Sequence, residues 1–205
     1  MAEHLGIVEI LGIAGSVSLL SGWRLYLTVL ATGLAMHFNA LPLPEHLAAL
    51  QVLANPWVMG VAGTAAFMEF FADKVAWLDS IWDTVHTLIR PLGGALLTLA
   101  VVDPADPATQ AIAFILGGGG ALLAHGGKAG ARAVVNTSPE PVSNVVVSTA
   151  EDVVTGGLLY LAYAYPVAAG AVAVGLFLAM IWLLVLARKA FKRFFNDPKS
   201  TAPEG

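Results

Sequence analysis

Long apolar runs separated by short polar breaks cover most of the chain. The main runs lie at residues 5–20, 57–71, 112–123 and 167–187. The last has no charged residue over 21 positions. At about 1.5 Å per helical residue it is long enough to cross a hydrocarbon core of about 30 Å. A soluble helical bundle would need a polar face on each of these helices, and the pattern provides none. The sequence therefore predicts an all-α integral membrane protein.

Clusters of proline, asparagine, aspartate and glycine divide the chain into predicted membrane elements. Six such elements are expected, at residues 5–38, 57–78, 80–102, 109–135, 143–164 and 167–188. Residues 43–53 predict a short interfacial helix between the first two. We expect one polytopic membrane domain over residues 1–195, and a disordered polar tail at 196–205.

The first element is too long for a simple crossing. As one helix its 34 residues would measure about 50 Å, which exceeds the bilayer. It must therefore be tilted, broken, or folded back as a re-entrant pair. The segment "SGW" at 21–23, directly before Arg24, is the expected hinge.

The fourth element contains two groups of glycines, which are poor helix formers. They are "GGGG" at 117–120 and "HGGKAG" at 125–130. One interpretation is a broken or re-entrant helix, and the other is close packing between helices.

Lysine and arginine placement predicts the orientation. Four basic residues, Arg188, Lys189, Lys192 and Arg193, follow the last element and place the C-terminus in the cytoplasm. Six crossings then place the N-terminus there as well. Arg24 fits no cytoplasmic loop, and Arg90 is a second, weaker exception.

The chain divides into two halves of three elements, 5–102 and 109–188. In both halves a glycine break is followed by a basic residue, Arg24 or Lys128, and then by a helix that carries an acid. Three crossings per half predict an inverted repeat, as in many transporters, whose broken elements would meet near the bilayer midplane.

Polar side chains on these elements form the main candidate site for a substrate or ion. They are Arg24, Glu69, Asp73, Lys128, Asn144, Ser148, Glu151 and Asp152. The basic groups favour an anionic substrate, whereas the carboxylates favour coupling to H⁺ or to a metal cation. For Glu69, a structural ion pair with Arg24 or Lys74 is an equally open interpretation.

A second polar stripe lies at the start of the third element. Asp79, Asp83, His86 and Arg90 share one face of a helix. Two interpretations are open: the stripe lies at the membrane interface beside two tryptophans, or it enters the membrane and lines the bundle interior.

Composition removes several classes of function. The formal net charge is −4, so nucleic-acid binding is not expected. The absence of cysteine excludes disulfides and thiolate sites. No nucleotide loop or metal motif occurs, so no cofactor is expected and a metal is left undetermined.

Three segments carry a family resemblance: "SGWRLYLTVLATGLAMHF", "FFADKVAWLDSIWDTVHTLIRPLGGALL" and "NTSPEPVSNVVVSTAEDV". They resemble a bacterial membrane family known as domain of unknown function 4126, over roughly residues 8–188. The resemblance implies a compact polytopic inner-membrane protein. It implies no catalytic residues.

Three hypotheses for function follow. The first is a small transporter or channel for an ion or small charged solute, acting as a homodimer in the bacterial inner membrane. The second is an intramembrane enzyme that uses the second polar stripe on a lipid or polyprenyl headgroup. The third is a scaffold or assembly factor without a site. Whether the protein is an enzyme stays open, although the sequence pattern favours a protein without catalytic activity.

Overall fold

The computed structural model describes residues 7–39, 45–102, 106–135 and 142–196 of the chain. These residues form α-helices and one 3-10 helix, with no strand among them. The elements are α1 (Ile7–His37), η1 (Glu45–Ala54), α2 (Pro56–Ala72), α3 (Ala76–Leu99), α4 (Pro107–Val135), α5 (Val142–Ala164) and α6 (Pro166–Asn196). Four of them, α1, α4, α5 and α6, are long and apolar enough to cross a membrane. The chain is therefore a helical, multi-pass membrane protein.

Helix boundaries follow the local chemistry of the sequence. Pro56, Pro107 and Pro166 each open a helix, where the missing proline N–H removes no intrahelical bond. The carboxamide of Asn55 and the carboxylate of Asp106 each accept a hydrogen bond from the backbone N–H two residues further on. The predicted element boundaries agree with the helices to within a few residues, with two exceptions: α2 ends at residue 72 and not at 78, and α6 extends to residue 196. The short helix predicted between the first two elements is η1.

Helix α1 folds back on itself at Arg24, whose backbone leaves the helical region at φ −143° and ψ 66°. Gly12, before the break, packs against the carbonyl of Pro166. Thr32, after the break, hydrogen-bonds to the hydroxyl of Tyr163 at 2.9 Å. A continuous helix would hold positions 12 and 32 about 30 Å apart, yet they contact Pro166 and Tyr163, which lie close together where α5 ends and α6 begins. The first element is thus broken at Arg24 and folded back on itself.

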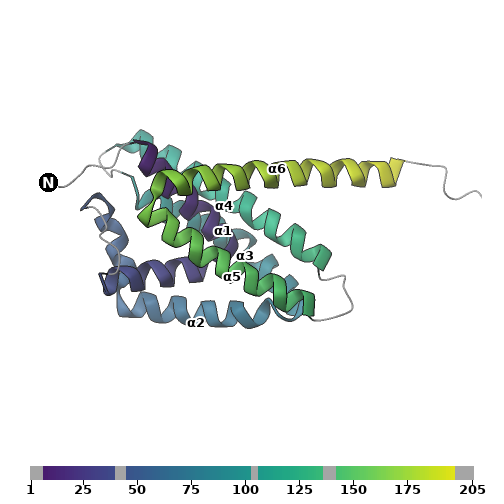
Figure 1. Cartoon of the computed structure of the whole chain (residues 1–205), viewed down its shortest axis with the longest axis horizontal. Coiled ribbons are helices and arrows are strands. Elements are labelled where there is room, and N and C mark those ends of the chain that lie inside the picture. Colours follow the sequence, from purple (N-terminus) through teal and green to yellow (C-terminus); the bar gives the residue numbers. More distant parts are fainter. Residues whose placement is uncertain (1–6, 40–44, 103–105, 136–141, 197–205) are drawn as a thin grey trace, which may run out of the picture.

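The two halves of α1 form a hairpin whose open ends lie at one end of the bundle, which we call the α1 end (Figure 1). Ile13 of the first half and Met36 of the second belong to one buried apolar cluster, together with Leu50 of η1 and Leu97 of α3. The core at the α1 end is therefore apolar and is built around the hairpin.

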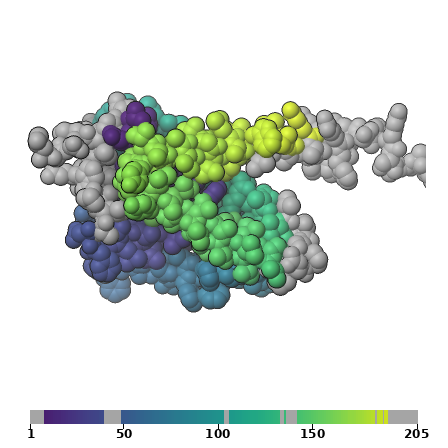
Figure 2. Space-filling model, viewed as in Figure 1, coloured from purple at the N-terminus to yellow at the C-terminus, as the bar shows by residue number. Residues whose placement is uncertain are grey.

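The remaining helices run alternately between the two ends of the bundle (Figure 1). The other end, which we call the charged end, contains the links from α2 to α3 and from α4 to α5. Helix α6 lies beside α5 and then projects past the other helices (Figures 1 and 2). The hairpin packs on helices of both predicted halves, 5–102 and 109–188, so they share one core.

Helix α4 is continuous from Pro107 to Val135, so the predicted break in the fourth element is wrong. Its glycines serve close packing instead. Gly117 packs against Thr98, and Gly127 packs against Met180. Because α1 folds back and α4 does not, the correspondence behind the predicted inverted repeat is absent and the repeat is not confirmed. The predicted tail lies outside the described residues, apart from position 196 at the end of α6.

Gly12 and Gly15 provide a matched test of the hairpin. A methyl group at Gly12 would collide with the Pro166 backbone, whereas one at Gly15 would meet open space. We expect Gly12→Ala to lower the free energy of unfolding by about 1–3 kcal/mol. Gly15→Ala is expected to raise it by up to about 1 kcal/mol, because alanine is the better helix former. Thermal unfolding of the purified protein in detergent measures both changes, and equal midpoints for the two variants would contradict this packing.

Candidate functional site

Arg24 lies at the tip of the α1 hairpin, and its side chain is only 1% exposed. One guanidinium nitrogen pairs with Asp73, which directly follows α2. The other lies 3.4 Å from Glu151 and 3.0 Å from Asp152 of α5, and it donates to the Ser148 carbonyl at 3.1 Å. The helix break therefore carries a buried cation into a group of three carboxylates.

Arg90 of α3 is the second buried cation. Its guanidinium pairs with Glu69 of α2 at 2.6 Å and with Asp83, two turns back on its own helix, at 3.0 Å. It also lies 2.7 Å from Nδ1 of His125 on α4. An arginine can only donate, so His125 accepts at Nδ1 and carries its ring proton at Nε2.

Lys128 of α4 joins these two groups of charges. Its ammonium lies 3.3 Å from Asp73, 3.7 Å from Glu151 and 3.9 Å from Glu69. It also donates to the backbone carbonyl of Trp23, at 3.2 Å. That carbonyl precedes the break in α1, where regular helical bonding is interrupted, so Lys128 supplies a partner for freed backbone.

Arg132, one turn after Lys128, completes the set of cations. It pairs with Asp79 of α3 at 3.2 Å and approaches Asp73 at 3.9 Å. It also donates to the backbone carbonyls of Asp73 and Asn144. One side chain thereby connects the α2–α3 link, α3 and the first turn of α5.

Together these residues form one continuous group, which we call the charge network. Its members are the cations Arg24, Arg90, Lys128 and Arg132, and the carboxylates Glu69, Asp73, Asp79, Asp83, Glu151 and Asp152. Six carboxylates thus share four cations among the described residues. Burial removes hydration from these charges, and the ion pairs among them offset part of that cost.

The two candidate sites of the sequence therefore merge into one. Asp79, Asp83, His86 and Arg90 are all buried along one face of α3, so the second stripe lines the interior of the bundle. His86 engages both ring nitrogens, one with the Tyr26 hydroxyl at 2.8 Å and the other with a backbone carbonyl of its own helix at 2.6 Å.

Other predicted site residues lie at the edge of the network. Asn144 and Ser148 are buried on α5 and accept hydrogen bonds from Arg132 and Arg24 respectively. The pairing predicted for Glu69, with Arg24 or Lys74, is not found. Glu69 pairs instead with Arg90 of α3 and Lys128 of α4.

Sequence reasoning missed three participants: Arg132, His125 and Tyr26. Arg132 lies inside the predicted fourth element, near its cytoplasmic end, and its side chain is 1% exposed. The available signal was helical spacing, since positions 125, 128 and 132 share one face of a helix. Tyr26 carries no comparable signal, because only the break at Arg24 orients it toward α3.

A cavity of about 370 Å³ reaches the charge network from the side of the bundle. It lies between α2 and α5, and Arg24, Glu69 and Asp152 form its charged inner wall. Gly156 and Val153 of α5 line it nearer the outside.

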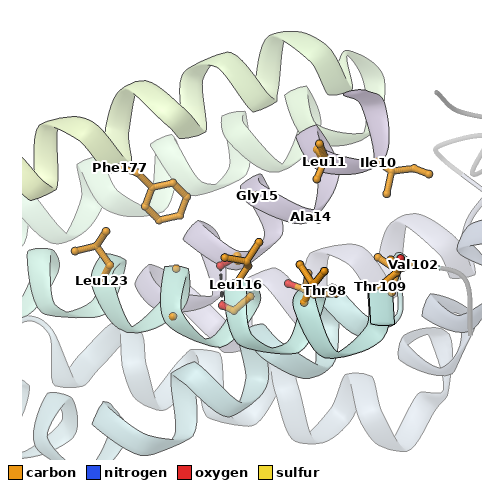
Figure 3. Close-up of a pocket in the computed structure, with 16 residues that line it drawn as sticks. Ile10, Leu11, Ala14, Gly15, Thr98, Val102, Thr109, Leu116, Leu123 and Phe177 are labelled. Atoms are coloured by element: carbon orange, nitrogen blue, oxygen red, sulfur yellow. Dashed lines mark hydrogen bonds between the residues drawn. The ribbon is translucent and has the colours of Figure 1, made fainter. Parts of the chain in front are cut away.

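A second cavity, of about 380 Å³, lies at the α1 end between α1, α3, α4 and α6 (Figure 3). Phe177 from α6 and Leu116 and Leu123 from α4 line it, and none of its lining residues is charged. It offers no recognition for a charged solute. No group of three or more histidines, aspartates and glutamates in the described part of the chain is arranged to hold a metal ion.

A family model described as Domain of unknown function (DUF4126) matches residues 11–186. The match includes every member of the charge network. No curated protein and no solved structure matches the chain.

Proposed function

The chain belongs to the DUF4126 family, whose description names no activity, and we propose from its geometry that it is a small membrane transporter or channel for an ion or small charged solute. The site is the charge network at the tip of the α1 hairpin. Ionisable groups are costly inside a membrane and usually serve transport or proton transfer there. A re-entrant helix break beside such groups is a recurring way of building an ion site.

The surplus of carboxylates carries this proposal and sets the sign of the charge. The charge network contains six carboxylates and four cations, so its carboxylates outnumber its cations by two. Lys74, beside the network, donates to the Phe70 carbonyl and to Ser148 and offsets one of them. A buried site of this composition gains by binding a proton or a cation. We therefore favour a cation over the anion that the two basic residues first indicated.

Helices α2 to α6 supply five crossings in this proposal, and α1 enters and leaves at the same side. The loops of the α1 end, at residues 39–56, 103–108 and 164–166, contain no lysine or arginine. Basic residues cluster at the charged end and beyond it on α6, so the charged end faces the cytoplasm. An odd number of crossings then places the N-terminus outside, which revises the orientation expected from six crossings. We retain the bacterial inner membrane and a homodimer as parts of the proposal.

Flux measurements on purified protein in liposomes test the proposal. A potential set by a potassium gradient drives uptake, which is followed by an internal pH-sensitive dye for H⁺ and by isotopes for small cations and anions. We expect flux of H⁺ or of a cation, and an approximately tenfold or larger loss in Glu69→Gln and Asp73→Asn. Asp106→Asn, which removes an exposed carboxylate at the α1 end, is the matched control and is expected to keep full flux.

Two outcomes would overturn the proposal. One is the absence of flux for every ion tested. The other is a loss of flux in the two variants that only follows their loss of folded protein, as a scaffold predicts. Flux of anions alone would overturn the assigned charge.

A further inference from the structure

The cavity between α2 and α5 opens onto the apolar outer surface of these two helices. Asp152 lies ten residues into α5, which is about 15 Å along the axis, or half the thickness of a hydrocarbon core. Phe70 and Val153 line the cavity and are also 40% and 71% exposed on the outer surface. The rim of the cavity is thus continuous with the apolar exterior of α2 and α5.

The inner wall of the same cavity is charged, and its sign is negative. Glu69 and Asp152 line it together with Arg24, whose guanidinium is already shared among three carboxylates. Asp152 is 25% exposed, the largest value among the carboxylates of the charge network. It is the acid most accessible to a molecule in the cavity.

An apolar rim and an anionic inner wall suit one class of ligand. A small inorganic ion has no reason to enter from lipid, because it would first have to lose its hydration. An anionic or uncharged lipid would bring no charge to match the surplus of carboxylates. A cavity of about 370 Å³ falls within the usual range for small-molecule sites.

We propose that this cavity binds an amphiphilic organic cation that enters sideways from the bilayer. Its cationic group lies against the carboxylates of Asp152 and Glu69, and its apolar body lies against Leu27, Ala66 and Val153. The inference deepens the proposed function and rests on it, since it names the substrate class that the transporter carries. No covalent step is involved.

Two lipophilic ions of nearly the same size and shape make the test direct. Tetraphenylphosphonium is the cationic probe and tetraphenylborate is its anionic counterpart. We expect the purified protein in detergent to bind the cation in equilibrium dialysis with a saturable isotherm, and to bind the anion no better than protein-free micelles do.

Adjacent glycines on α5 provide the matched variants. A Cβ atom added at Gly156 or at Gly157 meets nothing within 4 Å, but only Gly156 lines the cavity. Gly156→Phe is expected to weaken cation binding about tenfold or more by filling the cavity, and Gly157→Phe to leave it unchanged. Ala66→Phe blocks the cavity from the opposite wall, and Asp152→Asn removes the accessible charge. Gel filtration confirms that each variant is folded.

The outcomes separate this inference from the proposed function. Cation binding that Gly156→Phe and Ala66→Phe both leave intact, or equal binding of the two probes, would overturn the inference. So would a second copy of the chain covering the cavity, seen as a crosslink between cysteines at Gly156 of two protomers. If neither Gly156→Phe nor tetraphenylphosphonium alters the flux of H⁺ or of a cation, the proposed function is retained and the inference about the cavity is wrong. If Gly156→Phe weakens tetraphenylphosphonium binding but the protein shows no flux, the cavity is a binding site and the proposed transport function is wrong.

Discussion

Replacing Arg24 by glutamine is expected to lower the free energy of unfolding by about 3–5 kcal/mol. The substitution leaves Asp73, Glu151 and Asp152 without the guanidinium that they share, and Asp73 is fully buried. Removing one partner of a buried ion pair is costly because the other partner remains as an uncompensated charge. Thermal unfolding in detergent, followed by tryptophan fluorescence, measures the loss.

Two further variants separate charge pairing from general damage. In the double variant Arg24→Gln with Asp73→Asn, one of the stranded carboxylates is neutralised, so we expect a large part of the lost stability to return. Arg188→Gln, at an exposed position of α6, is the control and is expected to change stability by less than about 0.5 kcal/mol. If the double variant is less stable than Arg24→Gln alone, the pairing between Arg24 and Asp73 is not what holds the hairpin tip.

The proposed arrangement, in which α1 turns back at Arg24 and α2 to α6 each cross the membrane, predicts that the two termini lie on opposite sides. The chain contains no cysteine, so single cysteines can be introduced without background labelling. In intact bacterial cells, a membrane-impermeant maleimide is expected to label Glu3→Cys fully and Lys189→Cys only after the cells are opened. Six crossings predict protection at both positions.

Asn39→Cys is the control for this experiment. Asn39 follows α1 at the α1 end, so both the six-crossing and the five-crossing arrangement place it outside. Labelling of Asn39→Cys with protection of Glu3→Cys in intact cells would contradict the re-entrant arrangement and restore a crossing for α1.

Much of the fold could be predicted from the sequence because it depends on local chemistry. Proline and capping residues set the starts of α2, α4 and α6. The length of residues 5–38 showed that the first element could not be a simple crossing, and the spacing of Asp79, Asp83, His86 and Arg90 placed them on one face. Each of these inferences depends only on residues that are close together in the sequence.

The glycines of α4 show where such reasoning ends. "GGGG" and "HGGKAG" are consistent with a broken helix and with close packing, and the propensity of glycine is the same in both. The positions of Thr98 and Met180 favour close packing, since each side chain fills the space that a glycine leaves on α4. They lie on α3 and α6, far away in the sequence.

The sequence by itself determined that this is a helical membrane protein with charged residues inside its apolar elements, and it identified most of the residues that form the charge network. The tertiary structure decided how they pair: Glu69 with Arg90 and not with Arg24, and Arg132 with Asp79. The physical reason is that burial and helical spacing are properties of one helix. Ion-pair partners, and the single backbone turn at Arg24 that brings them together, depend on how separate helices pack.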